Sequence, residues 1–296
     1  MSSIESLNAE RFIGRRIGTA TILKELARGG MAVVFIAYQR TLKRHIAVKV
    51  LPKSNLSDQK VEMFQTEAEA AAILSHPNII QIYEVGETED FLFFTMQLVQ
   101  GITLLEILKN AKKQILPSKR ILPLNQTVKT IIQVLEALSY AHQQEIIHLD
   151  IKPENILVEM HTNRPLISDF GIARVMRGKQ YDSQTTGGSP LYMAPEQIIG
   201  ATVDGRTDIY AAGIMLFQML VPELPIPHFA SLESLLEHKL LNKEGIFLQA
   251  PSTINPILNK DMDKIIRRAT AYEPDRRYAT CKDFIKDLQW YKRRVL

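Results

Sequence analysis

Two kinds of hydrophobic periodicity divide the chain. From Ile13 to about Gln100, short β-branched or aromatic stretches are separated by Gly, Pro or charged residues, a pattern typical of strands. The predicted strands are RRIGTATILKEL, AVVFIAYQ, HIAVKVL, IIQIYEVGE and FLFFTMQLV. One stretch rich in Ala and Glu, Val61 to Ser75, interrupts them and predicts a helix.

After Gly101 the periodicity becomes helical. Apolar residues recur three and four apart in TLLEILKNAKK, TVKTIIQVLEALSYAHQQ, TDIYAAGIMLFQMLV and several later segments. The stretch Gln114–Asn125 contains two prolines and no clear period, so we expect a loop there. The sequence therefore predicts an α+β fold with a small mostly-β lobe, residues 1–98, and a larger mostly-α lobe, residues 99–296. Clefts between such lobes commonly bind ligands.

Composition limits the classes of function. The 296 residues, 46% of them hydrophobic, are enough to fill the cores of two lobes. The formal net charge of +4 suits an anionic ligand, but the basic residues are scattered, so we expect no nucleic-acid partner. The lone cysteine, Cys281, excludes an intramolecular disulfide and favours a cytoplasmic location, with the thiol buried. The start lacks a signal-peptide pattern, and the apolar run Ile209–Val221 is too short to span a membrane, so we expect no membrane segment within this chain.

A glycine turn and a lysine are the first candidates for chemistry. The turn LARGGMAVV joins two predicted strands, and its backbone N–H groups can approach phosphate oxygens because glycine has no side chain. Gly29-Gly30 alone is also typical of an ordinary hairpin. Lys49 follows within the apolar strand HIAVKVL, where an ammonium group needs a carboxylate or an anionic ligand. The predicted helix offers Glu67 and Glu69 as partners.

Two polar clusters follow in the helical half. The stretch EIIHLDIKPENIL places His148, Asp150, Lys152 and Asn155 between apolar residues, which by itself also fits a structural hydrogen-bonding loop. In ISDFGIAR, Asp169 follows a short strand, and the glycine two residues later allows a sharp turn that points the carboxylate outward. Together with the turn and the lysine, these clusters supply the parts that phosphoryl transfer needs, namely a phosphate cradle, a charge clamp, a base and metal ligands.

In this order along the chain, the motifs identify a family. The sequence resembles a eukaryotic-type serine/threonine protein kinase domain over nearly its whole length and is most similar to the bacterial members. The motifs that carry the resemblance are AVK, HLDIKPEN, DFG, APE and EPDRR. The resemblance implies that Asp208 in TDIYAAG is the helix-F aspartate and that Arg277 pairs with Glu196 of the APE motif. It also implies a serine/threonine preference, with Ser189 near the substrate hydroxyl.

The resemblance also implies a role for each catalytic residue. Asp150 is the catalytic base and Lys152 a lysine on the substrate side. Lys49, held by Glu67, grips the phosphates of ATP. Asn155 and Asp169 hold Mg²⁺, with Mn²⁺ as the alternative ion. The expected cofactor-binding residues, with Met96 as gatekeeper and the backbone of Gln97 and Val99 against adenine, are Leu26, Ala27, Arg28, Gly29, Gly30, Val34, Ala47, Lys49, Met96, Gln97, Val99 and Leu157.

The sequence departs from the family pattern in its glycine loop. The usual G-x-G-x-x-G-x-V becomes Ala27-x-Gly29-x-x-Ala32-x-Val34, with an additional Gly30 beside the surviving glycine. Alanine is small enough for a close approach but restricts the backbone. We therefore expect weakened or ordinary nucleotide affinity rather than its loss.

A second departure is Leu149, which stands between the histidine and the aspartate of HLD. Most kinases of this type have an arginine there that pairs with a phosphate on the activation loop. Leucine has no donor for that charge-assisted bond. We therefore expect phosphate on Ser183, Thr185 or Thr186 to change the catalytic rate little.

The sequence therefore predicts an active protein kinase that phosphorylates other proteins and itself. Two other classes of protein are alternatives. A pseudokinase that binds nucleotide or serves as a scaffold is disfavoured because Lys49, Asp150, Asn155 and Asp169 are all present. A small-molecule phosphotransferase of related fold generally lacks a segment such as GSPLYMAPEQ, which this chain has. The sequence leaves the physiological substrate, the activating signal and the oligomeric state open.

Overall fold

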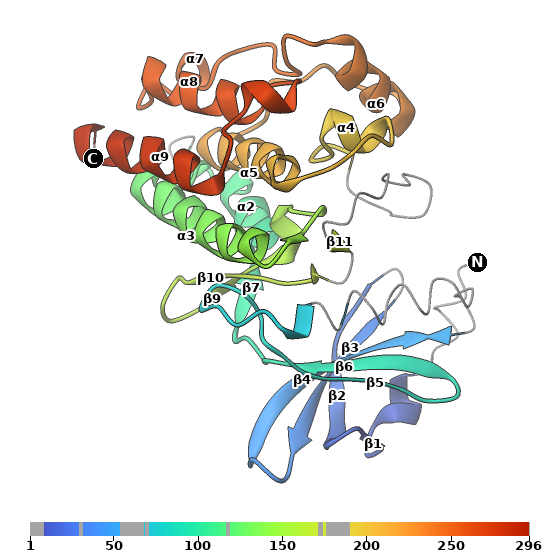
Figure 1. Ribbon diagram of the computed structural model, residues 1–296. Helices are drawn as coiled ribbons and strands as arrows, with labels where there is room; N and C mark the ends of the chain where they lie inside the picture. The colour runs from blue at the N-terminus through green and yellow to red at the C-terminus, as the bar shows by residue number, and fades with distance from the viewer. Residues whose placement is uncertain are drawn as a thin grey trace. The chain divides into compact units, whose positions relative to one another are not determined.

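The computed structural model describes residues 9–29, 32–53, 68, 71–116, 119–170, 174–175 and 190–295 (Figure 1). Its contacts divide the chain into two compact units, Met1–Gln100 and Gly101–Leu296. The first unit is mostly sheet and the second mostly helix, as the hydrophobic periodicity predicted. The predicted helix Val61 to Ser75 lies largely outside the described residues, although Ala68 and residues 71–72 are helical.

The first unit contains one six-stranded sheet in the order β1-β2-β3-β4-β6-β5. All of its neighbouring strands pair antiparallel. Its elements are the 3-10 helix η1 (Ala9–Phe12) and the strands β1 (Arg16–Ile17), β2 (Ala20–Arg28), β3 (Val33–Gln39), β4 (Arg44–Pro52), β5 (Ile82–Glu87) and β6 (Phe91–Met96). The first predicted strand is divided in two, because Gly18 has a φ of 53° and turns the chain between β1 and β2.

One face of this sheet forms the core of the first unit. Alternate residues of β3, among them Val33, Phe35 and Ala37, are completely buried, as expected for strands with a period of two. They pack with apolar residues of β2, β4 and β6. Phe12 of η1 closes this cluster, with its ring centroid 5.4 Å from that of Phe35. The alternation fixes which side chains of β3 and β4 face away from this core.

The second unit consists of helices with three short two- or three-residue strand pairings among its described residues. Its helices are α2 (Leu104–Lys112), α3 (Leu124–Gln143), α4 (Pro195–Ile198), α5 (Gly205–Leu220), α6 (Leu232–Leu241), α7 (Pro251–Ile254), α8 (Lys260–Ala269) and α9 (Cys281–Val295), with the 3-10 helices η4 (Pro153–Asn155) and η6 (Pro274–Arg276). Its strands are β7 (Gly101–Thr103), β8 (Ile146–Ile147), β9 (Ile156–Glu159), β10 (Pro165–Ile167) and β11 (Arg174–Val175).

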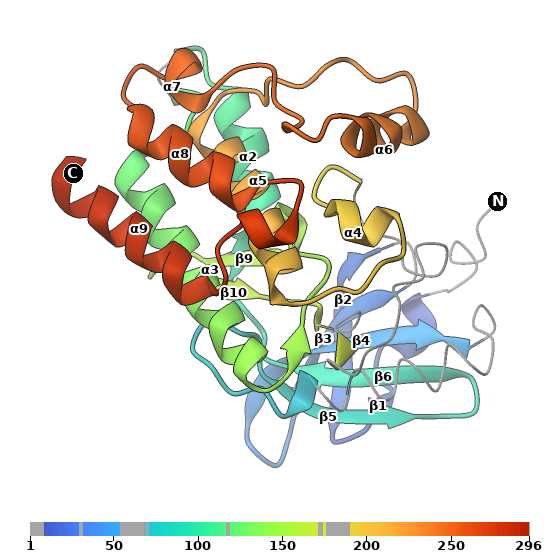
Figure 2. The same cartoon turned by 45° about the horizontal axis from the view of Figure 1, so that its top comes forward.

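Helix α5 is the central helix of the second unit. Nearly all of its residues are buried, which confirms the prediction of a buried helix over the apolar run Ile209–Val221. It packs against α3 on one side and α8 on another, and α9 lies along α3 (Figures 1 and 2). Helix α3 begins at Leu124, so the predicted loop Gln114–Asn125 is wrong at its last residues. The helix begins there because Pro123 occupies the N-cap position, where its missing N–H removes no helical hydrogen bond.

The short strands position the polar loops of the second unit. Strand β9 pairs with both β7 and β10, and β8 pairs with β11. The segment with His148, Asp150 and Asn155 connects β8 to β9, and Asp169 follows β10. The two predicted polar clusters are therefore anchored by neighbouring hydrogen-bonded strands. Among the described residues, no helix is long and apolar enough to cross a membrane.

Candidate active site

In the first unit, Lys49 lies in the middle of β4. Its strand register places it beside Val34 of β3 and Phe94 of β6. The Lys49 ammonium lies 5.5 Å from the centroid of the Phe94 ring, a distance at which the ring face attracts a cation. The sequence-predicted partner Glu67 and the alternative Glu69 both lie outside the described residues.

The glycine turn between β2 and β3 is tight. The Gly29 N–H donates to the Ala32 carbonyl at 2.9 Å, and Ala27 lies opposite Val34 in the strand register. The Arg28 side chain forms an ion pair with Glu25 at 2.9 Å. Gly30, the other glycine of the predicted cradle, lies outside the described residues. Leu26, also in the predicted nucleotide set, is 49% exposed.

The residues predicted to contact adenine lie at and just after the end of β6. Ala47 of β4 is opposite Met96 in the strand register, two residues before the pair formed by Lys49 and Phe94. The Gln97 N–H donates to the Gln81 carbonyl at 2.9 Å, so a further backbone contact at Gln97 has to use its carbonyl oxygen. Val99 follows β6 in a stretch without regular secondary structure, and Leu157 of β9 belongs to the second unit.

In the second unit, Asp208 of α5 fixes the loop after β8. One carboxylate oxygen accepts the His148 N–H at 2.9 Å, and the other accepts the Leu149 N–H at 2.8 Å. The His142 imidazole of α3 lies 2.8 Å from the same carboxylate. Burial opposes the charge of Asp208, but the hydrogen bond from His142 holds the pKa of Asp208 below its usual value. The backbone of this loop is therefore bound to a permanent buried anion.

Asp150 lies at the centre of the sequence-predicted polar cluster and is 8% exposed. The Lys152 ammonium lies 2.7 Å from one carboxylate oxygen and donates to the other at 3.0 Å. The Asn155 side-chain amide donates to the same residue twice, to the carboxylate at 2.9 Å and to the backbone carbonyl at 2.8 Å. The structure thus brings together three of the predicted residues and orients the Asp150 carboxylate.

Asp169 is connected to this cluster through Ser168. The Ser168 N–H donates to the Asn155 carbonyl at 2.9 Å, and its hydroxyl lies 3.4 Å from the Asp169 carboxylate. The backbone of Asp169 has a φ of 58°, a left-handed conformation that is uncommon for residues other than glycine. The sequence suggested that the following glycine supplies the sharp turn; in the structure the left-handed residue is Asp169 itself, and Gly171 lies outside the described residues.

His148 supports the residues on both sides of Asp169. Its ring accepts the Asp150 N–H at 3.2 Å and lies 2.9 Å from the Ser168 carbonyl through its other nitrogen. The ring packs edge to face with Phe170 at a centroid distance of 4.6 Å. His148 is completely buried, which fits a role in holding the two loops together.

Asn155 and Asp169 fit the chemistry of a hard divalent cation. Because the Asn155 nitrogen donates to Asp150, its amide oxygen is directed away from that carboxylate. An amide oxygen together with an exposed carboxylate such as Asp169 is a donor set that Mg²⁺ and Mn²⁺ favour. Among the residues described, no group of three or more His, Cys, Asp or Glu side chains could hold a metal ion. A cation at this loop would therefore take its remaining ligands from water or phosphate oxygens.

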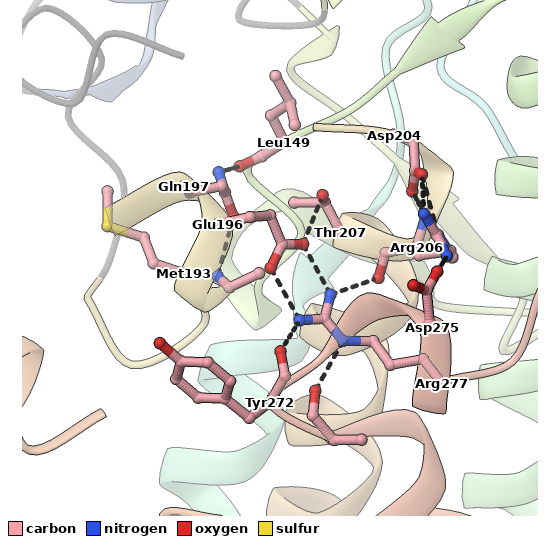
Figure 3. A network of polar contacts seen from close by, with 12 residues as sticks. Leu149, Met193, Glu196, Gln197, Asp204, Arg206, Thr207, Tyr272, Asp275 and Arg277 are labelled. Carbon is pink, nitrogen blue, oxygen red and sulfur yellow. Dashed lines mark hydrogen bonds and ion pairs between the residues drawn. The ribbon is translucent and has the colours of Figure 1, made fainter. Parts of the chain in front are cut away.

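The APE motif opens α4 and is bound to the C-terminal part of the chain (Figure 3). The Arg277 guanidinium donates to both Glu196 carboxylate oxygens, at 2.7 and 2.8 Å, and both side chains are buried. The Thr207 hydroxyl of α5 donates to Glu196 at 2.8 Å. Arg277 also donates to the carbonyls of Ala271 and Tyr272. The pairing of Arg277 with Glu196 that the resemblance implied is confirmed.

Gln197 joins α4 to the loop of the predicted base. Its amide nitrogen donates to the Leu149 carbonyl at 3.0 Å, and its oxygen accepts the Ala194 N–H at 3.0 Å (Figure 3). Leu149 itself is 6% exposed, has a φ of 65° and packs with Ile147 and Val203. Leu149 therefore contributes an apolar contact and a carbonyl to this region. Ser183, Thr185, Thr186 and Ser189 lie outside the described residues.

The sequence interpretation missed Gln197 and His142. The His142 ring contacts Asp208 through one nitrogen and the Cys281 thiol, 3.7 Å away, through the other. Burial opposes protonation, but the hydrogen bonds to Asp208 and Cys281 raise the pKa of His142 to about 10. Its position one residue after the buried Ala141 in an amphipathic helix was the available signal. Cys281 is buried, as predicted.

The chain has extensive similarity to known proteins. A family profile described as "Protein kinase domain" matches residues 20–290. The chain is 33% identical over 282 residues to the serine/threonine-protein kinase PrkC of Bacillus subtilis, covering 94% of this chain and 41% of that protein. It is 32% identical over 270 residues to PknB of Mycobacterium leprae, covering 89% of this chain and 41% of that protein. The chain therefore spans about two fifths of the length of these curated relatives.

The similarity extends to solved structures. The crystal structure of the Mycobacterium tuberculosis PknI kinase domain matches with a TM-score of 0.71 and 25% sequence identity. The match covers 94% of this chain and 98% of that one. The predicted fold class, with a curled β-sheet unit and a helical unit, is confirmed by this match and by the elements described above.

Proposed function

Because the chain belongs to the protein kinase domain family, we propose that it transfers the γ-phosphoryl group of ATP to serine and threonine hydroxyls of proteins. The relatives whose names give an activity are serine/threonine-protein kinases, and they match over most of this chain. We also expect the protein to phosphorylate serine or threonine residues of its own chain. The observation that carries the proposal is the environment of Asp150.

The Asp150 carboxylate is prepared for an acceptor hydroxyl. Lys152 and Asn155 hold it from two directions, so its free energy of reorientation on binding an acceptor is small. In the reaction, the acceptor oxygen forms a bond to the γ-phosphorus while the bond from that phosphorus to the bridging oxygen breaks. ADP leaves, and the acceptor's proton passes to Asp150. Because Lys152 contacts Asp150, we assign it to the acceptor side of the reaction.

The divalent ion that accompanies ATP neutralises phosphate charge when it is bound. We assign Asn155 and Asp169 as its protein ligands, with Mg²⁺ as the physiological ion and Mn²⁺ as a substitute, because both supply hard oxygen donors from adjoining loops. The left-handed backbone of Asp169 supports this assignment, since strained residues are frequent at ligand sites.

We propose that the residues of the first unit bind the nucleotide. Lys49 contacts the α- and β-phosphates and is held by Glu67, and the turn at Gly29 approaches the phosphates through its backbone. The Gln97 carbonyl and the Val99 backbone contact adenine. The apolar neighbours of the adenine that the first unit supplies in this proposal are Leu26, Ala27, Val34, Ala47 and Met96. Arg28 is engaged with Glu25, so its part in nucleotide binding is its backbone.

A magnesium-dependent transfer assay tests the proposal. Purified protein is incubated with γ-labelled ATP, Mg²⁺ and dephosphorylated casein as a generic acceptor, and labelled phosphoserine and phosphothreonine are measured. Asp150→Asn should lower the transfer rate by about 10²–10⁴-fold and leave ATP binding nearly unchanged, because the base is removed while the phosphate contacts remain. An Asn variant that retains most of the activity would contradict the role of Asp150. Labelling of small molecules but not of casein would indicate a small-molecule phosphotransferase.

A further inference from the structure

Lys239 of α6 is a buried cation with an unusual set of partners. Lys239 is only 1% exposed. Its ammonium donates to three backbone carbonyls, those of Pro190 at 3.0 Å, Leu191 at 2.8 Å and Met193 at 2.5 Å. Lysine is rarely buried to this extent without a carboxylate partner. Here all three acceptors lie within one short loop, the Pro190–Met193 segment.

Three carbonyl acceptors require three donors on one nitrogen. Only the protonated ammonium group has them, since a neutral amine has two. Burial and, to a smaller extent, the Arg277 charge lower the pKa of Lys239 to about 7, although the Glu196 charge opposes them. The Tyr210 ring of α5, 5.0 Å from the ammonium, contributes a face that attracts a cation. The site therefore satisfies all three donors of the protonated Lys239 side chain.

Two observations place the Pro190–Met193 segment near the loop that carries Asp150. The Gln197 side chain, four residues after Met193, donates to the Leu149 carbonyl next to Asp150. Tyr192 donates to Gln218 of α5 at 2.6 Å, and burial together with the nearby Glu154 carboxylate raises the pKa of Tyr192. Glu154 belongs to the loop of the predicted base. The segment therefore lies near the loop that carries Asp150 and Glu154.

The side chains of this segment are divided between interior and surface. Tyr192 and Met193 are buried, whereas Pro190 and Leu191 are half-buried. Because the carbonyls are bound to Lys239 in the interior, the half-buried side chains form the outward surface of the segment.

We propose that Lys239 is a positioning residue that holds the Pro190–Met193 segment in the shape that binds the acceptor polypeptide next to the transferred phosphate. The proposal rests on the proposed function and deepens it. Lys239 touches neither ATP nor the acceptor hydroxyl and acts through the three carbonyls. Its loss leaves these carbonyls without their donor, and the segment then rearranges to expose them to water. Binding of the polypeptide weakens, while the nucleotide residues keep their positions.

The test compares Lys239→Met with the wild-type protein in steady-state kinetics. Initial rates are measured against casein concentration at saturating MgATP and against ATP concentration at saturating casein, together with slow ATP hydrolysis without acceptor. We expect the KM for casein to rise about tenfold, since one buried charge-assisted contact set is lost. The KM for ATP and the hydrolysis rate should stay within about twofold of the wild type.

Lys243→Met is the matched control. Lys243 lies four residues later, is exposed, and has its ammonium 5.8 Å from the Tyr272 ring, so its removal should change none of these parameters. Lys239→Arg keeps a charge and several donors and should restore a large part of the casein affinity. Lys239→Gln keeps two donors and provides a second test if the Met variant is poorly stable. Thermal unfolding of each variant is recorded beside the kinetics.

The outcomes separate the two proposals. A wild-type protein that does not phosphorylate casein would contradict the proposed function and this inference with it. An active wild type with an unchanged casein KM in Lys239→Met would overturn only the inference. The inference is also overturned if the KM for ATP and the hydrolysis rate change as much as the casein KM, or if both the Met and the Gln variants are unfolded at the assay temperature. Lys239 would then stabilise the fold as a whole.

Discussion

Asp208 and Lys239 hold two neighbouring loops of the helical unit with opposite charges. The Asp208 carboxylate accepts backbone N–H groups of the loop that carries Asp150. The Lys239 ammonium donates to backbone carbonyls of the Pro190–Met193 segment. Each charge is buried, and each satisfies polar groups that would otherwise be unpaired in the interior.

The two charges differ in how firmly they are held. Asp208 has a cationic partner in His142, which stabilises its anionic form. Lys239 has no carboxylate within hydrogen-bonding distance among the described residues, and burial lowers its pKa to about 7. The loop that carries Asp150 is therefore anchored at all ordinary pH values, whereas the Pro190–Met193 segment is anchored by a group whose pKa is about 7. The anchoring of the first loop should not change near neutral pH, whereas the anchoring of the Pro190–Met193 segment should depend on pH.

Breaking the Asp208 anchor should have the largest effect. Asp208→Asn removes the negative charge that pairs with His142 and leaves fewer acceptors for the N–H groups of His148 and Leu149. We expect the free energy of unfolding to fall by about 3–5 kcal/mol, as for other buried charge pairs that lose one member. Urea unfolding followed by circular dichroism measures this change.

Asp204→Asn is the matched control on the same helix. Asp204 caps the N-terminus of α5 and pairs with Arg206 near the surface, where its side chain is 43% exposed. Asparagine is also a good N-cap residue, so we expect a loss below about 1 kcal/mol. Equal losses at the two positions would show that Asp208 contributes no more than a surface carboxylate.

The titration of Lys239 predicts a pH dependence of acceptor binding. A base with a pKa of about 7 is about nine-tenths protonated at pH 6 and about one-tenth at pH 8. The anchored segment is thus present below the pKa and lost above it. The kcat/KM for casein should therefore fall several-fold as the pH rises through this range, while the KM for ATP changes less.

The comparison with Lys239→Arg isolates this effect. Three ionisable groups face Lys239 from the neighbouring elements. Glu196 is paired with Arg277, and burial raises the pKa of Tyr210. The Arg variant keeps the same three neighbours, so the comparison isolates the group at position 239. The ratio of wild-type to Arg-variant kcat/KM should fall with pH, and a constant ratio would contradict the titration of Lys239.

A smaller effect is expected at the contact between the two loops. Gln197→Ala removes one hydrogen bond to the Leu149 carbonyl and one from the Ala194 N–H, both buried. We expect a loss of about 1–3 kcal/mol in stability and a casein KM raised only a few-fold, since Lys239 still holds the segment. Gln197→Glu keeps the acceptor for Ala194 and loses the donor, so it separates the two contacts. Unchanged kinetics in both variants would show that the loops are independent.

The sequence predicted the parts of this molecule that follow periodicity or known motifs. The strands around Lys49 and the buried helix α5 followed from patterns of apolar residues, and Glu196 with Arg277 followed from the family resemblance. The contacts of Gln197 and Lys239 could not be predicted in this way. Both depend on where backbone groups far apart in the sequence come together, and a lysine four residues after the buried Leu235 was the only local signal.

The smallest effect is expected for phosphorylation of the segment after Asp169. Leu149 has no donor for a phosphate and is packed with Ile147 and Val203, and its carbonyl is bound to Gln197. The backbone of the loop that carries Asp150 is therefore held by Asp208 and Gln197 without a phosphate. A Ser183/Thr185/Thr186→Ala triple variant should differ from the wild type by less than about twofold in rate after preincubation with MgATP, because no charge-assisted bond is lost. The measurement follows product formation by protein that was dephosphorylated beforehand. A lag in the wild type that the triple variant lacks, with a large difference in final rate, would show that phosphate orders the loop through another cation.

Leu149→Arg should create such a lag, because the new guanidinium supplies the missing donor. The φ of 65° at this position strains leucine and arginine to a similar degree, so the backbone should tolerate the substitution.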